Sequence, residues 1–209
     1  MAFGYFMNME KLSLTIVEKH ISCMTNDNYE NDCCLDMQKI INNIENGFVI
    51  ITQLSCYFES FLNTIINACM NYDGEVLLKC SVEEKIDFIF MHYQKDWQTV
   101  KGQNPWAVYK KTTRVRNEMI HFKKTFIGDG SSMGIPNFEL GGQGVAEFFT
   151  KQNMLLVRDG YISLAELIAT NLGLNIFKNI HIFECDGMDE LVNYVYDGSD
   201  NDIDESRYE

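Results

Sequence analysis

The chain has 209 residues, 46% of them hydrophobic, and a formal net charge of −13 at pH 7. A chain of this length can bury one sizeable core, so we expect a single domain over residues 1–196. Residues 197–209 are acidic and offer little apolar surface, which predicts a disordered tail. The overall acidic charge excludes a protein that binds nucleic acid over its whole surface.

The sequence also favours a cytoplasmic protein. The N-terminus has no basic region, and no continuous apolar run approaches the roughly 20 residues that cross a bilayer, so neither secretion nor membrane insertion is expected. The seven cysteines are irregularly spaced and include no C-x-x-C pair. This pattern fits a reducing compartment, and we expect no metal site and no cofactor.

Apolar residues recur at spacings of three and four along most of the chain, which predicts an all-α fold. The first helix is expected over residues 7–24, followed by a loop over 25–32. A second helix is expected over 35–72, with Gly47 as its weak point. Its second half, 48–70, is apolar almost all round, which is typical of a helix in the middle of a bundle or at a dimer interface.

Local signals mark where the next two helices begin. Ser81, followed three residues later by Glu84, predicts a capping box at the start of a helix. Asn104 as N-cap, with Pro105 at the first helical position, predicts another helix over residues 106–124.

The pattern is less regular after residue 124. The glycine-rich stretch 128–144 predicts a loop. Further helices are expected near 145–149, extending variably onward, and over 162–172. A short final element is expected over 188–196. A small β-hairpin or an irregular insertion could follow the 106–124 helix, and the candidate strand residues are Phe138, Leu140, Ile180 and Ile182.

Basic residues gather in one part of this acidic chain. Residues 110–124 contain six basic residues and one acid, a net charge of +5, against −18 for the remainder. A local basic patch can bind a polyanion, whereas a solvated helix face is the alternative interpretation. The candidate phosphate-binding residues are Lys110, Lys111, Arg114, Lys123 and Lys124.

Four polar side chains of the 106–124 helix share one stripe, because they follow i, i+3, i+7, i+10 spacing: Arg114, Asn117, His121 and Lys124. Arg116 precedes His121 by five residues, which places it about 140° round the helix. Its long side chain could still reach the same cleft. Glu59 could be a buried partner of Arg116 or an exposed residue.

The segment 116–121, Arg-Asn-Glu-Met-Ile-His, resembles the R-N-x-x-x-H form of the R-x4-6-H motif of HEPN domains. HEPN domains are helical bundles found in toxin–antitoxin systems, abortive-infection proteins and RNA-guided effectors. The order of elements is also similar: a long apolar helix, a shorter helix opened by Ser81, and then the motif helix. The resemblance covers residues 35–124 and implies a HEPN-like helical bundle.

The resemblance implies a metal-independent endoribonuclease that serves as a toxin or in antiviral defence. The RNA 2′-hydroxyl would attack the adjacent phosphate, leaving a 2′,3′-cyclic phosphate and a 5′-hydroxyl. His121 would act as general acid or base. Arg116 would bind the phosphate, and Asn117 would orient His121 or the phosphate. A homodimer is implied, with both motif helices in one composite site.

The motif departs from one family feature, because Lys123 stands where some HEPN toxins carry a tyrosine that a partner enzyme modifies. An antitoxin or regulatory partner protein is still an expected partner, and Lys123 and Lys124 would suit flanking phosphates. Three alternatives stay open. The chain could be a catalytically silent HEPN-like dimer that binds RNA, a nucleotide or a partner protein. It could be an antitoxin-like or scaffolding bundle. Arg116 and His121 could be ordinary surface residues, beside an ion pair of Arg114 with Glu118.

Overall fold

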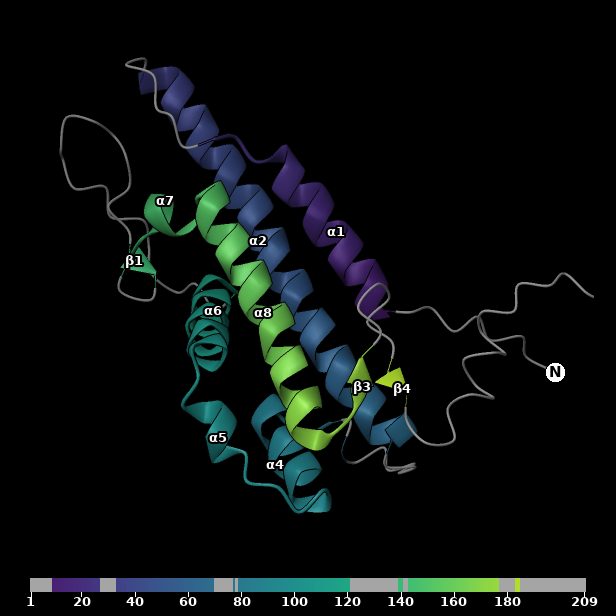
Figure 1. Ribbon diagram of the computed structural model, residues 1–209. Helices are drawn as coiled ribbons and strands as arrows, with labels where there is room; N and C mark the ends of the chain where they lie inside the picture. The colour runs from purple at the N-terminus through teal and green to yellow at the C-terminus, as the bar shows by residue number, and fades with distance from the viewer. Residues whose placement is uncertain are drawn as a thin grey trace, which may run out of the picture.

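The computed structural model describes residues 9–26, 33–69, 77, 79–120, 139–140, 143–176 and 183–184. Over these residues the protein is an all-α bundle, as the apolar periodicity predicts (Figure 1). Its helices are α1 (Met9–Cys23), α2 (Cys33–Thr64) with a short π-helical continuation η1 (Ile65–Cys69), α4 (Val82–His92), α5 (Gln98–Lys101), α6 (Asn104–Ile120), α7 (Val145–Phe148) and α8 (Lys151–Leu172).

Two pairs of very short strands accompany the helices: β1 (Glu139–Leu140) is antiparallel to β2 (Gln143–Gly144), and β3 (Asn175–Ile176) is antiparallel to β4 (Phe183–Glu184). Two-residue pairs form no layer of their own, so the helices determine the architecture. Leu140 lies in a strand as expected. The other three candidate strand residues, the 188–196 element and the acidic tail lie outside the described residues.

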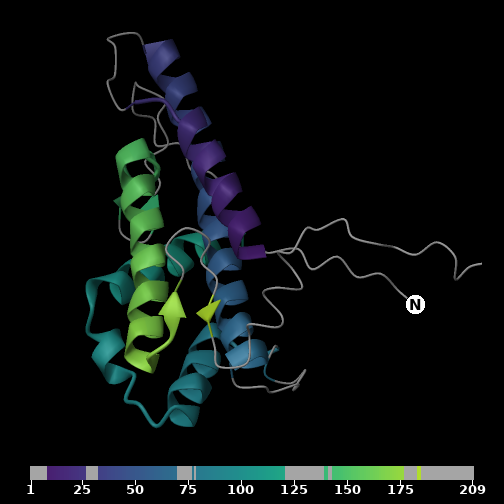
Figure 2. The ribbon, with the colours of Figure 1, turned by 45° about the vertical axis from the view of Figure 1, so that its right-hand side comes forward.

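Helix α2 is the central helix of the bundle. It contacts α1, α4, α6, α7 and α8, and α1 runs antiparallel along one side while α8 lies along another (Figures 1 and 2). Its apolar residues from Ile50 to Leu62 include many that are fully buried, such as Leu54 and Phe58. The prediction that this helix lies in the middle of a bundle is therefore confirmed.

One described helix, Gln38–Asn67, is long and apolar enough to cross a membrane when judged only by length and composition. This corrects the expectation that no segment is apolar enough to cross a bilayer. Polar residues interrupt the apolar run, but the mean hydropathy over 18 residues is still high enough. In the bundle, 56% of its most apolar 18-residue window is buried by the rest of the protein. A central helix of a folded domain satisfies the same criterion.

Two glycines allow helices to approach closely. A Cβ on Gly47 would lie 2.2 Å from Cδ1 of Phe149, and a Cβ on Gly160 would lie 2.6 Å from Cγ1 of Val108. At each position a side chain of another element occupies the space that a Cβ would need. This packing keeps both glycines inside continuous helices. This explains why α8 begins at Lys151 and not near residue 162, where the expected helix starts.

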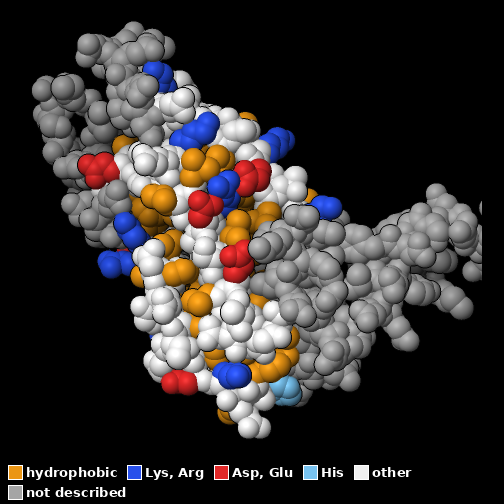
Figure 3. Space-filling view, viewed as in Figure 1, with side chains coloured by type: hydrophobic (Ala, Val, Ile, Leu, Met, Phe, Trp, Pro, Cys, Tyr) orange, Lys and Arg blue, Asp and Glu red, His pale blue; other side chains and the backbone are white. Residues whose placement is uncertain are grey.

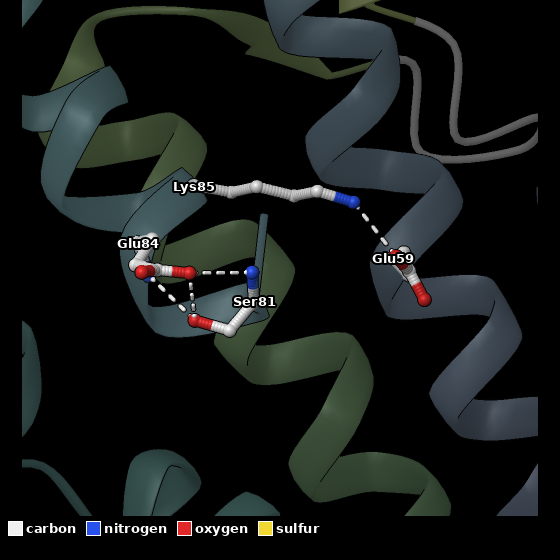
Figure 4. Close-up of polar contacts among 4 residues, drawn as sticks. All are labelled: Glu59, Ser81, Glu84 and Lys85. Atoms are coloured by element: carbon white, nitrogen blue, oxygen red, sulfur yellow. Dashed lines mark hydrogen bonds and ion pairs between the residues drawn. The ribbon is translucent and has the colours of Figure 1, made fainter. Parts of the chain in front are cut away.

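The predicted capping box of α4 is confirmed. The Ser81 hydroxyl accepts a hydrogen bond from the Glu84 amide at 3.3 Å, and the Glu84 carboxylate accepts one from the Ser81 amide at 2.7 Å (Figure 4).

The start of α6 differs slightly from the prediction. The Gln103 carbonyl accepts a hydrogen bond from the Trp106 amide at 3.1 Å. Asn104 therefore lies in the first turn and is not the N-cap.

Glu10 is a buried carboxyl group between α1 and the C-terminal part of α2. The residue is 4% exposed, and its Oε1 accepts a hydrogen bond from the Thr64 hydroxyl at 2.7 Å. Burial raises the pKa of Glu10 from 4.5 to about 7, and the hydrogen bond from Thr64 offsets part of this rise. The folded protein therefore binds a proton that the unfolded chain releases between those pH values.

This raised pKa predicts a pH-dependent stability. The free energy of unfolding should be highest below pH 4.5, as far as Glu10 is concerned, and should fall as pH rises to about 7. The expected loss is about 3 kcal/mol. Glu10→Gln, a neutral isostere that can still accept the Thr64 hydrogen bond, should remove this loss. Urea unfolding of both proteins at pH 5 and pH 8 measures the difference, and an identical pH dependence would contradict the prediction.

Candidate functional site

Helix α6 carries two of the three predicted catalytic residues near its C-terminal end. Its buried face, formed by residues at spacings of three, packs against α2 and α8. The residues of this face are Trp106, Tyr109, Thr112 and Val115. Arg116 follows directly and is half-buried, whereas Asn117 is exposed. The core therefore fixes the helix, and Arg116 lies at the boundary between the core and solvent.

Arg116 and Asn117 contact each other. The Nε and Nη2 atoms of Arg116 donate hydrogen bonds to Oδ1 of Asn117 at 3.3 and 3.0 Å. Within the described part of the chain, no carboxylate forms an ion pair with Arg116, so its charge is not neutralised there. The neighbouring amide holds the guanidinium group in a defined position. His121 lies outside the described residues, so the predicted contact between Asn117 and His121 stays a prediction.

The predicted phosphate-binding residues do not form one continuous cationic stripe. Lys110 forms an ion pair with Glu83 of α4, and Arg114 pairs with Glu118 at 2.8 Å. The Arg114–Glu118 pair that the sequence offers as an alternative is thus present. Nζ of Lys111 lies over the ring of Phe148, 5.6 Å from its centroid. Lys123 and Lys124 fall beyond the last described residue of α6.

Both ion pairs are largely exposed to solvent. The two side chains are 52% and 47% exposed in the Lys110–Glu83 pair and 70% and 34% exposed in the Arg114–Glu118 pair. Exposed pairs of this kind contribute only about 0–1 kcal/mol. A phosphate group could therefore replace either carboxylate as the partner at little energetic cost.

A pocket of about 340 Å³ lies beside Arg116, between α2, the start of α4 and α6. Its polar lining residues include Ser55, Glu59, Ser81, Glu83, Tyr109, Thr113 and Arg116. The sequence-based reasoning missed this pocket. The helical spacing i, i+4, i+7 of Tyr109, Thr113 and Arg116 puts them on one face, but only the tertiary packing shows that α2 and α4 close the other sides.

Two buried hydroxyl groups lie near this pocket: Thr113 lines it, and Tyr161 lies behind the lining residue Tyr109. Thr113 Oγ1 and the hydroxyl of Tyr161 are buried and make no hydrogen bond within the described residues. Burial raises the pKa of Tyr161 to about 12. Burial likewise raises the pKa of Tyr109. Both phenols therefore stay neutral near pH 7 and can donate hydrogen bonds.

Glu59 lies in the wall of the pocket and pairs with a buried lysine. The Lys85 side chain is 0% exposed, and its Nζ donates to Oε1 of Glu59 at 2.7 Å (Figure 4). The side chain of Glu59 is 50% exposed. The partner of Glu59 is thus Lys85 of α4, and of the two interpretations that the sequence leaves open, a buried partner of Arg116 or an exposed residue, the structure supports the second. The ion pair fixes one oxygen of the carboxylate.

Charged residues of both signs are spread over the face of the molecule shown in Figure 3, with apolar side chains between them. Among the residues that the structure describes, no group of three or more His, Cys, Asp or Glu side chains is placed to hold a metal ion. The most distinctive chemistry of the described surface is therefore the half-buried Arg116 at the edge of a polar pocket.

Comparison with protein-family models, with curated proteins and with solved structures gives no match to this chain. The class that the fold defines is an all-α bundle.

Proposed function

We propose that this protein is a metal-independent endoribonuclease of the HEPN type that acts in the cytoplasm as a toxin or defence protein. The observation that carries the proposal is the position of Arg116. Its guanidinium group is held by Asn117, has no acidic partner among the described residues, and borders a polar pocket. An unneutralised arginine in such a place is suited to bind a phosphate group.

The proposed reaction needs no chemistry beyond these side chains and RNA itself. The 2′-hydroxyl loses its proton to a base, its oxygen forms a bond to phosphorus, and the bond to the 5′-oxygen of the next nucleotide breaks. The leaving oxygen takes up a proton. His121 serves as base or acid near neutral pH, and Arg116 stabilises the negative charge that develops on the phosphate oxygens.

A homodimer completes the proposed site. Ile120, the last described residue of α6, is 54% exposed directly before His121. In a dimer, this apolar side chain would contact the second motif helix and lose its contact with water. The two motif helices would then supply two arginines and two histidines to one RNA phosphate. A regulatory partner protein that covers this surface would restrain the activity.

The test is cleavage of a mixed RNA pool by the purified full chain in the presence of a chelator. We expect products with 2′,3′-cyclic phosphate ends, and we expect His121→Ala to lower the rate by about a hundredfold or more. His92→Ala is the matched control, because His92 is an exposed histidine of α4 that lies outside the proposed site.

Equal cleavage by the wild type and His121→Ala would contradict the assigned role of His121. If the wild type cleaves no RNA but still binds it, the catalytically silent alternative is supported instead.

A further inference from the structure

The pocket beside Arg116 combines charges that suit a ligand with both an anionic group and hydrogen-bond donors. Arg116 supplies a cation at the edge. Glu59 and Glu83 each use Oε1 in an ion pair, with Lys85 and Lys110 respectively. Their side chains are 50% and 47% exposed. A carboxylate has about four lone-pair positions on its two oxygens, so both groups can accept further N–H or O–H donors.

One buried hydroxyl in the lining of the pocket is available to a ligand. Thr113 lines the pocket, and its hydroxyl has no partner among the described residues. Tyr161 is 0% exposed, lies behind the lining residue Tyr109 with their ring centroids 5.7 Å apart, and also has an unpartnered hydroxyl. Buried polar groups without partners are rare in folded proteins. A bound ligand that carries donors and acceptors would satisfy the group that faces the pocket.

The size of the pocket limits the ligand. Its volume of about 340 Å³ is near the lower end of the roughly 300–1,000 Å³ that is typical of small-molecule sites. A single nucleoside fits this range better than a longer segment of RNA. The wall residue Tyr109 is 6% exposed, so little of its ring is open to solvent. Polar contacts from the carboxylates and hydroxyls would therefore dominate recognition.

We propose that this pocket binds the guanine nucleoside on the 5′ side of the cleaved phosphate. The proposal rests on the proposed ribonuclease function, since it places that phosphate at Arg116. Guanine presents N1–H and the N2 amino group side by side, and a carboxylate accepts such a pair of donors. Adenine and cytosine present an amino group beside an acceptor nitrogen, which a carboxylate repels, and uracil presents one N–H between two carbonyls.

Binding of 3′-GMP to the full chain, measured by calorimetry, tests the pocket without requiring catalysis. We expect 3′-GMP to bind about tenfold more tightly than 3′-IMP, which lacks the N2 amino group, and more tightly than 3′-AMP. Glu83→Gln and Thr113→Val should each weaken 3′-GMP binding by about tenfold. Thr112→Val is the matched control, because its hydroxyl donates to the Val108 carbonyl at 2.8 Å and lies outside the pocket.

Mapping of RNA cleavage sites provides the second measurement, and the expected result is cleavage mainly after guanosine. If no RNA is cleaved but 3′-GMP binds and both pocket variants weaken it, the guanine pocket is supported and the ribonuclease function fails. If RNA is cleaved equally after all four nucleotides and 3′-GMP does not bind, the pocket proposal is overturned and the ribonuclease function stands. If the chain neither cleaves RNA nor binds 3′-GMP, both fail.

Discussion

Replacing Arg116 by alanine is expected to slow RNA cleavage by about a thousandfold, which is the upper range for the loss of one group that stabilises a developing negative charge. The hydrogen bonds of the guanidinium group within the described residues go to its neighbour Asn117, so its removal should leave the fold intact. Thermal unfolding and single-turnover cleavage of the same preparation separate the two effects. A variant that unfolds at the wild-type temperature but does not cleave would support the assigned role.

Variants of neighbouring residues make this experiment specific. Arg116→Lys keeps the charge but loses the planar pair of donors, so most of the activity should still be lost. Asn117→Ala should have a smaller effect, about tenfold, because Asn117 acts by positioning Arg116. Arg158→Ala is the control: this arginine of α8 pairs with Glu18 and Asp159 and does not line the pocket. Wild-type cleavage by Arg116→Ala would exclude Arg116 from the reaction.

The features of the fold that depend on local sequence could be predicted. The apolar run of α2 indicates a central helix, and it is central because a helix that is apolar all round must be covered on several sides. The capping box of Ser81 and Glu84 depends on residues three apart, and it forms as expected. These signals need no knowledge of the remainder of the chain.

Features that depend on tertiary packing could not be predicted in the same way. Gly160 precedes the expected 162–172 helix in the sequence, yet it lies inside α8 and provides the space that Val108 of α6 occupies. The same holds for the ion pairs of α4. Lys110 and Glu83 are 27 residues apart, and their pairing requires the first turn of α4 to lie within reach of the Lys110 side chain of α6. Only the folded arrangement specifies these contacts.

One part of the candidate site could likewise be predicted from local sequence, and the other part depends on tertiary packing. The motif identifies Arg116 and Asn117 from the order of residues, and the structure shows that their side chains contact each other. The pocket beside them requires three elements that are separated in the sequence, α2, α4 and α6. The roles of His121, Lys123 and Lys124, the HEPN relation and the homodimer stay predictions.

The wall of this pocket also contains the ion pair between the buried Lys85 and the half-exposed Glu59. We expect Glu59→Ala to lower the free energy of unfolding by about 3–4 kcal/mol. The reason is that Lys85, with a side chain that is 0% exposed, would retain a buried ammonium group without its carboxylate partner. Removal of one partner of a buried pair typically costs about 3–5 kcal/mol. The lower part of this range applies because Glu59 is 50% exposed.

The double variant Glu59→Ala/Lys85→Met separates the cost of the unpaired charge from the loss of packing. Methionine is close to lysine in length, so it can fill the same buried space without a charge, and apolar replacement of a buried ion pair is often neutral or stabilising. We therefore expect the double variant to recover most of the stability that Glu59→Ala loses, as measured by urea unfolding. If the double variant is as unstable as Glu59→Ala, the contribution of Glu59 lies in its packing and not in the charge of Lys85. If it recovers, α4 is joined to α2 chiefly by apolar contacts, and the function of the ion pair is to hold a carboxylate beside Arg116.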